Sequence, residues 1–464
     1  MTLSQQLIAK LRTLRWVAIP PEVRDAAKLH LLDAMGVGFA AAATGAGAPY
    51  LKAAPALSGN GPATVFGSDE GFTAAAAALA NGGMIHGLEY DDTHTASIVH
   101  GSSVLASAAL AAAESVGASN DALLLAYIKG WEVLIRARLA APGKFQAQGF
   151  QVTSVAGALA AAIVAADLFG LDEAEAVHAI GIALSQSSGV FEFLTNGSTV
   201  KSLHAGWAAH AGVTAATLAA ARLTGPATAF EGKFGLFRRF AADDAAADRF
   251  AASIETLGSV WHLPEAAFKF YPCCHYIHPF IEALEIALAE SPNRPIQAVM
   301  CEVPPGATAL ISDPWEPKLA PQSGHEARYS LPIALAARLV EGSVTPATFA
   351  DAPSAEIVAK AKRMSAREMV GADFPNRFEA RIHVAFADGD THQIYVEDVF
   401  GGARRPPPRE AVLQKFRANL SAIGAECDVR TLEDAVFAGE GRSINELTQA
   451  LRRFRRGSMA HAAE

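Results

Sequence analysis

Most of the chain repeats its apolar residues with the period of a helix. From Ser4 to about Leu263, apolar positions recur every three to four residues, and polar capping residues separate the periodic segments. Residues 118–121, Ala-Ser-Asn-Asp, precede one such segment, and residues 170–172, Gly-Leu-Asp, precede another. Serine and aspartate side chains accept hydrogen bonds from the first backbone N–H groups of a helix. The pattern therefore predicts an all-helical body over this part of the chain.

The pattern changes near residue 265. Residues 296–303 and 380–386 alternate apolar and polar side chains, which is the period of a strand. Asp388-Gly389 comes next, and residues 391–396 alternate again, which predicts a hairpin with its return strand. This middle section is expected to be α+β. Its predicted helices are residues 331–340 and 355–367.

Helical periodicity returns near the C-terminus, at residues 409–423 and 443–454, after the breaks at Gly401-Gly402 and Pro406-Pro407-Pro408. We therefore expect a mainly α protein, with one large all-helical domain built from both termini and an inserted, smaller α+β lid domain. The predicted domains are residues 1–264 plus 400–464 for the helical part and residues 265–399 for the lid. A binding site between two such domains is a common arrangement.

Length and composition favour a folded protein of two domains. The chain has 464 residues, more than one core usually supports, and 51% of them are hydrophobic. A net charge of −9 opposes nucleic-acid binding, and the basic residues within 452–456 are expected to form a solvated tail. The apolar run at 155–166 is too short to cross a bilayer, and residues 1–20 show no export signal. We expect a cytoplasmic protein with no nucleic-acid or membrane partner.

The cysteines do not predict a metal centre or a disulfide scaffold. Cys273, Cys274, Cys301 and Cys427 lack the C-x-x-C spacing of zinc and iron–sulfur sites. Four cysteines in 464 residues are also far too few for a secreted, disulfide-rich fold. Reduced thiols and chemistry without a metal are the expectation.

Residues 86–100, H-G-L-E-Y-D-D-T-H-T-A-S-I-V-H, concentrate acid–base groups between two apolar segments. They form a turn between predicted helices at 73–87 and 104–116, and Gly101-Ser102-Ser103 resembles the cap of the second. The free N–H groups at that helix N-terminus would favour an anion. An acid–base site for a carboxylate is the main interpretation. The alternatives are a hydrogen-bonded structural turn and a metal site, although these histidine spacings match no standard ligand motif.

Two further clusters are candidates for binding. Residues 201–207, K-S-L-H-A-G-W, open a long apolar helix after a loop rich in small polar residues. Lys201 can serve there as a fixed positive charge for a carboxylate, and the alternative is a solvated surface lysine. Residues 269–279, K-F-Y-P-C-C-H-Y-I-H-P, lie at the predicted domain joint. Their aromatics, thiols, lysine and histidines favour a pocket wall, and the alternative is a packed hinge.

Taken together, these segments resemble the MmgE/PrpD family, which includes 2-methylcitrate dehydratase, cis-aconitate decarboxylase and iminodisuccinate epimerase. The matching strings follow one another over nearly the whole chain: I-P-P-E-V from residue 19, L-L-D-A-M-G from 31, E-Y-D-D-T-H from 89, K-S-L-H-A-G-W-A-A-H-A-G from 201, L-T-G-P-A-T-A-F-E-G from 223, K-F-Y-P-C-C-H-Y-I-H from 269 and E-A-R-Y-S-L-P-I-A from 326. The resemblance implies a helical domain with an inserted lid, a homodimer, and catalysis without a metal or an organic cofactor.

The resemblance also points to particular residues. The family pattern falls on Glu89, Thr93, His100, Lys201, His204 and Lys269, and Glu89 stands where relatives often have aspartate. Gln151 and Cys274 stand where decarboxylase-like members carry histidine. Glutamine does not exchange protons near neutral pH, and a thiol is a weak donor. Both departures count against a cis-aconitate decarboxylase.

The reactions of this family handle a proton on carbon beside a carboxylate, while negative charge accumulates on the carboxylate oxygens. We expect His100, aided by Asp91 or Asp92, to be the general acid–base group. Lys201 and Lys269 are expected to hold the carboxylates and stabilise the charge, and lid closure about residues 264–269 would exclude water. The residues expected to contact the substrate are Glu89, Thr93, Gln151, His204, Cys274 and His275.

The favoured function is therefore a metal-free hydro-lyase, similar to 2-methylcitrate dehydratase, that acts on a small di- or tricarboxylate. One alternative is a decarboxylase or epimerase of a related acid. The other is a non-catalytic dimeric protein that binds carboxylates.

Overall fold

The computed structural model describes residues 1–195, 197–421, 429–437 and 441–454. The protein is mainly α, as predicted, and it forms two compact units. Unit 1 comprises residues 1–87, 91–266 and the described residues from 408 onward, and unit 2 comprises Leu88–Tyr90 and Ala267–Pro407. The short segment Leu88–Tyr90 thus packs with unit 2, although it falls inside the helical domain drawn from the sequence.

Four apolar helices form the centre of unit 1: α4 (Ala74–Gly87), α5 (Gly101–Val116), α8 (Val152–Leu168) and α10 (Lys201–Ala220). The last of these, α10, packs along α4 and α8, and α5 contacts all three. Small residues allow the close approach, since a Cβ added to Gly82 of α4 would lie 2.7 Å from the Cα of Gly206 in α10. The alanine-rich and glycine-rich sequence therefore brings the ends of these helices close together.

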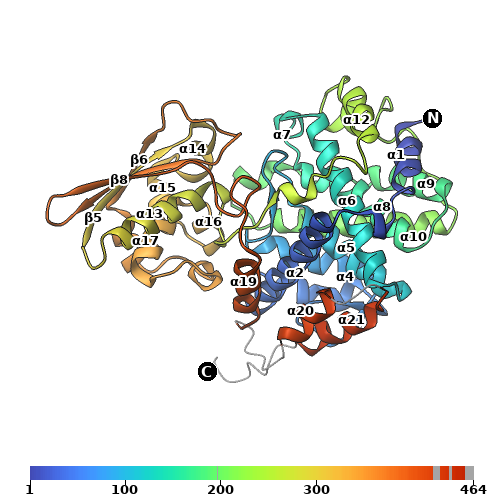
Figure 1. The fold of residues 1–464 in the computed structure, drawn as a ribbon, viewed down its shortest axis with the longest axis horizontal. Coiled ribbons are helices and arrows are strands. Elements are labelled where there is room, and N and C mark those ends of the chain that lie inside the picture. The colour runs from blue at the N-terminus through green and yellow to red at the C-terminus, as the bar shows by residue number, and fades with distance from the viewer. Residues whose placement is uncertain (196, 422–428, 438–440, 455–464) are drawn as a thin grey trace. The chain divides into compact units, whose positions relative to one another are not determined.

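Other helices surround this centre: α1 (Leu3–Leu11), α2 (Pro21–Ala43), α3 (Ala48–Ala53), α6 (Asn120–Ala140), α7 (Lys144–Ala147), α9 (Glu173–Leu184), α11 (Leu236–Phe240), α12 (Ala246–Glu255), α19 (Arg409–Ser421), α20 (Val429–Phe437) and α21 (Ile444–Arg453). The predicted caps are confirmed, because Ser119 accepts a hydrogen bond from the Ala122 N–H and Asp172 forms a capping box with Glu175. The C-terminal helices α19 and α20 pack on α2, as the red and blue ribbons of Figure 1 show.

Three predictions for unit 1 were wrong in detail. The unit is not purely helical, because β1 (Asn60–Thr64) pairs antiparallel with β2 (Gly71–Phe72), and β3 (Thr93–His94) is a further short strand. Helix α5 begins at Gly101 and not at residue 104. Nor do the described residues of the C-terminal basic cluster form a solvated tail: the Arg452 Nε donates to the Thr64 Oγ1 (3.2 Å), and Phe454 is buried against Phe39. Residues 422–423, 427 and 455–456 lie outside the described residues.

Unit 2 is built on a four-stranded sheet with strand order β6-β5-β7-β8. The strands are β5 (Ile296–Val303), β6 (Met364–Glu368), β7 (Ala380–Phe386) and β8 (Thr391–Val396), and β7 and β8 form the predicted hairpin. Helices α13 (His278–Glu290) and α17 (Leu331–Glu341) pack together, and α13 contacts β7 and β8. Alternate strand residues such as Val299, Cys301 and Val384 belong to the hydrophobic core. The shorter helices are α14 (Pro305–Ile311), α15 (Trp315–Leu319), α16 (Gly324–Ala327) and α18 (Ala355–Ala361), and β4 (Ala266–Ala267) has one residue in each unit.

The helix predicted at residues 355–367 was wrong in its second half. Helix α18 ends at Ala361, and the chain then enters β6, which pairs parallel to β5 with Met364 opposite Val299. Met364 is buried and joins the core of unit 2. Pairing with a neighbouring strand and burial of one side chain outweigh the local helix propensity of this segment.

Among the described residues, no single helix is both long enough and apolar enough to span a membrane. Pro21–Ala43 together with Ala48–Leu57 meets the length and composition requirements as a pair, with a bend of 80° between the two parts.

Candidate active site

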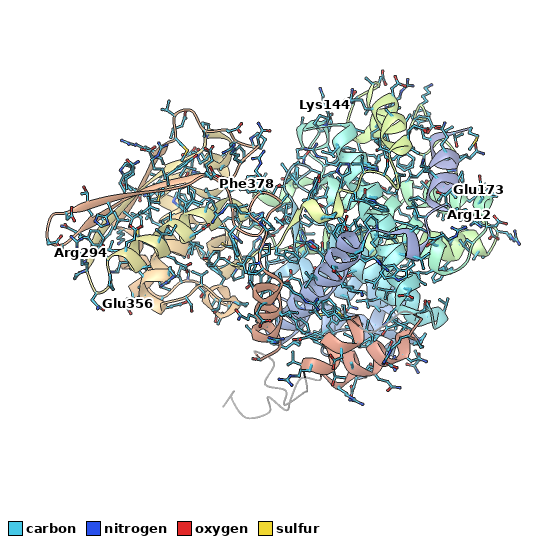
Figure 2. The ribbon with its side chains drawn as sticks, in the orientation of Figure 1. Arg12, Lys144, Glu173, Arg294, Glu356 and Phe378 are labelled. Carbon is cyan, nitrogen blue, oxygen red and sulfur yellow. The ribbon has the colours of Figure 1, made fainter. Side chains whose placement is uncertain are left out.

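The acid–base residues of the 86–100 segment are buried. Many charged side chains of unit 1 lie on its outside, as Arg12, Lys144 and Glu173 do in Figure 2. By contrast, His86, Asp91 and Asp92 are at most 1% exposed, and His100 is 8% exposed. Burying ionisable groups is unfavourable unless they are paired. The hydrogen-bond and charge partners of these buried groups therefore define the candidate site.

The turn between α4 and α5 brings the two ends of the segment together. His86 lies in the last turn of α4, His100 immediately precedes α5, and their ring centroids are 4.7 Å apart. The His94 N–H donates to the Val99 carbonyl (2.9 Å) and closes the turn. A Cβ at residue 101 would lie 2.4 Å from the ring of Trp131, so glycine is required for the backbone to pass there.

His100 is oriented through one ring nitrogen. Its Nδ1 lies 3.1 Å from the backbone carbonyl of Asp92, 3.2 Å from the Thr93 Oγ1 and 3.5 Å from the Asp91 Oδ2. A carbonyl oxygen can only accept, so the Nδ1 carries a proton and donates it. In the neutral ring the second nitrogen, Nε2, is then the unprotonated one.

A hydrogen-bonded chain connects Asp91 to α8 and α10. The His86 Nδ1 donates to the Asp91 Oδ2 (2.8 Å), the Gln151 Nε2 donates to the His86 Nε2 (3.3 Å), and the His204 Nδ1 donates to the Gln151 Oε1 (2.6 Å). Each donor in this assignment has an acceptor, which fixes His86 and His204 in single tautomers. Gln151, just before α8, is therefore a non-titrating bridge between two histidines.

Asp91 carries the negative charge of this group. Burial opposes its ionisation, but His86 and His100 together hold the pKa of Asp91 well below its ordinary value. Its second oxygen, Oδ1, is buried without a hydrogen-bond partner among the described residues. Asp91 is thus an ionised base with one oxygen not used by its protein neighbours.

Asp92 has a different environment from Asp91. Its carboxylate accepts from the Ser102 N–H (3.1 Å) at the start of α5, from the Ser102 hydroxyl, and from the His30 Nδ1 (2.8 Å). The anion expected at this helix N-terminus is therefore a side chain of the protein itself. Asp92 contacts His100 through its backbone carbonyl, and the carboxylate near that ring belongs to Asp91.

Lys201 and His204 occupy the first turn of α10. Lys201 is half-buried, and His204 is 7% exposed. Burial, with further contributions from His86 and Lys201, lowers the pKa of His204 to about 4. His204 is therefore neutral at physiological pH and acts as a hydrogen-bonding group.

This pKa gives folding stability a specific pH dependence. Between pH 6.5 and about 4, His204 binds a proton in the unfolded chain but not in the folded one, so the unfolding free energy falls as the pH falls. Replacing His204 with glutamine should remove about 3 kcal/mol of the loss between pH 7 and pH 4. Urea unfolding at both pH values measures this difference, and a His392→Gln control should keep the wild-type dependence. The same pH dependence of the unfolding free energy in wild type and in His204→Gln would contradict this prediction.

A second charged cluster lies within unit 2. The Lys269 Nζ donates to the Glu89 backbone carbonyl (3.1 Å) and lies 3.6 Å from the Glu89 Oε2. Glu89 has a φ of 53°, a left-handed conformation that is uncommon for glutamate and frequent at functional sites. Burial and a hydrogen bond with Glu89 raise the pKa of Tyr329 well above its ordinary value, so its hydroxyl is a permanent donor. Arg328, 5% exposed, adds a positive charge beside Glu89.

The cysteines beside Lys269 are buried thiols. Cys273 is fully buried, which raises its pKa well above the ordinary value, and Cys274 is 6% exposed. The Cys274 N–H donates to the Arg328 carbonyl (2.9 Å). His275 packs its ring edge-on against His278 and Phe378, with centroids 4.8 and 5.3 Å away. His275 is therefore buried among aromatic rings of unit 2.

The domain profiles of one protein family cover the chain. The MmgE/PrpD N-terminal domain matches residues 5–248, and the MmgE/PrpD C-terminal domain matches residues 271–438. The chain belongs to the MmgE/PrpD family. The first match lies within the sequence of unit 1 apart from residues 88–90, and the second begins in the segment that carries Cys273 and Cys274.

Three curated relatives of this MmgE/PrpD chain share just over a quarter of its residues. It is 27% identical over 446 residues to a cis-aconitate decarboxylase of Aspergillus terreus, covering 90% of this chain and 89% of the relative. It is 28% identical over 419 residues to the cis-aconitate decarboxylase of Homo sapiens, covering 85% and 83%. A cis-aconitate decarboxylase-like protein of Aspergillus oryzae is 28% identical over 457 residues, covering 92% and 93%.

The structure groups the predicted site residues into two sets. Unit 1 brings together Asp91, Thr93, His100, Gln151 and His204, with Lys201 on the same turn of α10 as His204. Unit 2 brings together Glu89 and Lys269, and the backbone N–H of Cys274 donates a hydrogen bond to the Arg328 carbonyl. The expectation that both sets line one pocket stays a prediction.

Sequence reasoning missed several members of these sets. His86 belongs to the charged segment but was given no role, and Arg328 and Tyr329 belong to the E-A-R-Y-S-L-P-I-A string, which could have found them. No sequence signal pointed to His30, because it is the one histidine of α2 and lies far from the charged segment in the sequence.

The donor atoms of His86, Asp91 and His100 lie within 4.8 Å of one another, which is close enough for the three side chains to ligate one metal ion. Two observations favour a proton network instead. The His86–Asp91 distance of 2.8 Å is that of a hydrogen bond, whereas ligands around one zinc ion lie about 3.3 Å apart. The other nitrogen of His86 already accepts from Gln151.

Proposed function

We propose that this MmgE/PrpD protein is a lyase that acts on a small di- or tricarboxylate, and that His100 transfers the proton. One observation carries the proposal: Asp92 and Thr93 hold the protonated His100 Nδ1 beside the ionised Asp91, and we infer that the Nε2 is the nitrogen that exchanges a proton. A carboxylate 3.5 Å away stabilises the imidazolium form. The ring can therefore hold a proton and release it to carbon.

Positive charge is the second requirement, because the electrons left on carbon delocalise into the neighbouring carboxylate. Lys201 at the start of α10 is our candidate in unit 1, and Lys269 with Arg328 are our candidates in unit 2. Thr93, Gln151 and His204 are proposed to orient the substrate through hydrogen bonds. Glu89, Cys274 and His275 stay predicted substrate contacts.

Decarboxylation of an unsaturated tricarboxylate similar to cis-aconitate is the first candidate reaction. The carbon–carboxylate bond breaks, carbon dioxide leaves, and the electron pair that remains on carbon takes the proton from the His100 Nε2. This reaction needs one proton donor, and His204 is neutral with its Nδ1 proton committed to Gln151. The names of the curated relatives support the same reaction.

Dehydration of a hydroxylated tricarboxylate, the function favoured from the sequence, is the second candidate. The observation in its favour is Gln151, because the resemblance places this residue where decarboxylase-like members carry histidine. In this case one group removes a proton from carbon and a protonated group donates to the departing hydroxyl. The expected homodimer and cytoplasmic location stay predictions.

Product analysis in deuterated water tests the proposal and separates the two reactions. The purified chain is incubated separately with cis-aconitate, 2-methylcitrate and citrate. Carbon dioxide release, with one deuterium incorporated at the carbon that lost the carboxylate, is the expected result. Formation of an unsaturated acid without release of carbon dioxide would show that the reaction is dehydration and not decarboxylation. Tight binding of these acids with neither product nor deuterium exchange would overturn the lyase proposal in favour of a binding protein.

A further inference from the structure

Unit 1 contains another cluster of histidine and carboxylate groups, which shares no residue with the proposed reaction. It consists of His94 on β3 together with His262 and Glu265. The Glu265 Oε2 lies 3.2 Å from the His94 Nε2 and 3.1 Å from the His262 Nδ1. All three donor atoms lie within 4.8 Å of one another.

These distances suit a divalent cation. Zinc binds imidazole nitrogen and carboxylate oxygen at about 2.0–2.2 Å in a tetrahedron, which places neighbouring ligand atoms about 3.3 Å apart. The two nitrogen–oxygen distances of 3.1 and 3.2 Å are close to this value, whereas the 2.8 Å between His86 and Asp91 is too short. Two histidines and one glutamate are a recurrent donor set for zinc, with a fourth position for water.

Neighbouring groups hold the ligands in place. His94 is 1% exposed, and its Nδ1 lies 2.7 Å from the Ser97 Oγ and accepts from the Ser97 N–H (3.2 Å), so Ser97 holds the ring with its Nε2 toward Glu265. The Glu132 Oε1 accepts from the backbone N–H groups of His262 and Leu263 at 2.8 and 3.0 Å. The backbone that carries His262 is therefore fixed by a buried carboxylate.

The cluster is open to solvent on one side, and its charge is negative. The side chain of Glu265 is 49% exposed, and that of His262 is 19% exposed. Arg136 is the nearby positive charge, but its guanidinium lies 3.4 Å from the Glu132 carboxylate and donates to the Val260 carbonyl. Arg136 also interacts with Glu265, but Glu132 carries the opposite charge to Arg136, so Glu132, Arg136 and Glu265 together keep one net negative charge that favours a cation.

We propose that His94, His262 and Glu265 form a binding site for one divalent cation of the zinc class. The ion would join the turn that carries His100 to residues 262–265 and so stiffen that turn. The inference rests on these three side chains and is independent of the proposed lyase activity.

Titration calorimetry with Zn²⁺ tests the site on the untagged, metal-free, full-length chain. The expected result is one Zn²⁺ per chain, with Co²⁺ at the same site giving the visible absorption of a tetrahedral complex. Glu265→Gln keeps the shape of the side chain, and His262→Ala removes a partly exposed one. Each should weaken Zn²⁺ binding about 100-fold or more, while a His392→Ala control should leave it unchanged.

A second measurement separates ligand loss from misfolding. Without metal, the Glu265→Gln chain should have the circular dichroism of wild type, and added Zn²⁺ should raise the melting temperature of wild type but not of this variant. The proposal is overturned if wild type binds no Zn²⁺, or if both variants bind it as tightly as wild type. It is equally overturned if His86→Ala, and neither of those variants, abolishes binding, since the ion would then lie at the other cluster.

Discussion

Replacing His100 with asparagine should lower kcat/KM by about 10³-fold on the acid that the protein turns over, while the fold stays intact. Asparagine keeps a polar side chain of similar reach, but it cannot exchange protons near neutral pH. The loss should appear mainly in kcat, because the proton is transferred in the transition state and ground-state binding depends on other groups. Steady-state kinetics over a range of pH measures both parameters.

The matched control is His392→Asn, which makes the same chemical change at a half-buried histidine of unit 2. Its kcat/KM should remain within about threefold of wild type, as is usual for a surface substitution. A His100→Asn variant with wild-type turnover would remove His100 from the proposed role. A variant with normal kcat and raised KM would show that His100 binds the substrate without moving a proton.

Replacing Lys415 with methionine should lower the unfolding free energy by about 3–5 kcal/mol. The Lys415 Nζ on α19 lies 2.8 and 2.9 Å from the two carboxylate oxygens of Asp33 on α2, and both residues are fully buried or nearly so. Removal of the lysine leaves the negative charge of Asp33 in the core without its partner. Chemical denaturation, with the midpoint and slope fitted together, measures the loss.

Two comparisons decide whether the ion pair is the cause. Lys129→Met breaks a pair with Asp167, whose side chain is 30% exposed, so its cost should be smaller, about 1 kcal/mol. The double variant Asp33→Asn with Lys415→Met removes both charges and should recover more than half of the loss. Equal losses in the single and double variants would assign the effect to packing and not to charge.

The same lysine also bears on the proposed active site. Its charge interacts with those of Asp91 and Asp92 as well as with Asp33. Asp92 in turn caps α5 and orients His100 through its backbone carbonyl. Helix α19 lies more than three hundred positions after Asp33 in the sequence, so no local pattern reveals this support.

Much of the local structure followed from the sequence. The strands at Ile296–Val303, Ala380–Phe386 and Thr391–Val396 were predicted with the bounds that they have, because alternation along each strand records which face is buried. Ser119 and Asp172 were identified as caps because their chemistry is local. The helix predicted at residues 355–367 was wrong over its last residues, because β6 depends on pairing with β5, which lies over sixty residues away.

The candidate site was predicted in its members but not in their connections. His100 and both aspartates were identified, since so many acid–base groups in one short segment of an apolar chain are unusual. Asp91 and Asp92 are adjacent in sequence and could not be distinguished from it. Their environments differ because His86 contacts Asp91, whereas His30 and Ser102 contact Asp92. The placement of Gln151 between His86 and His204 likewise needs three helices to converge.

The amino-acid order by itself determined the family, the mainly helical fold, and the segments that make up the candidate site. These depend on composition, on periodicity and on motifs whose residues are neighbours along the chain. Tertiary structure alone decided which carboxylate faces His100, which nitrogen of each histidine carries the proton, and that Glu89 packs with Lys269 and Tyr329. Hydrogen bonds and charge interactions act over a few ångströms in space, and the folding of the chain selects the groups that come within that range.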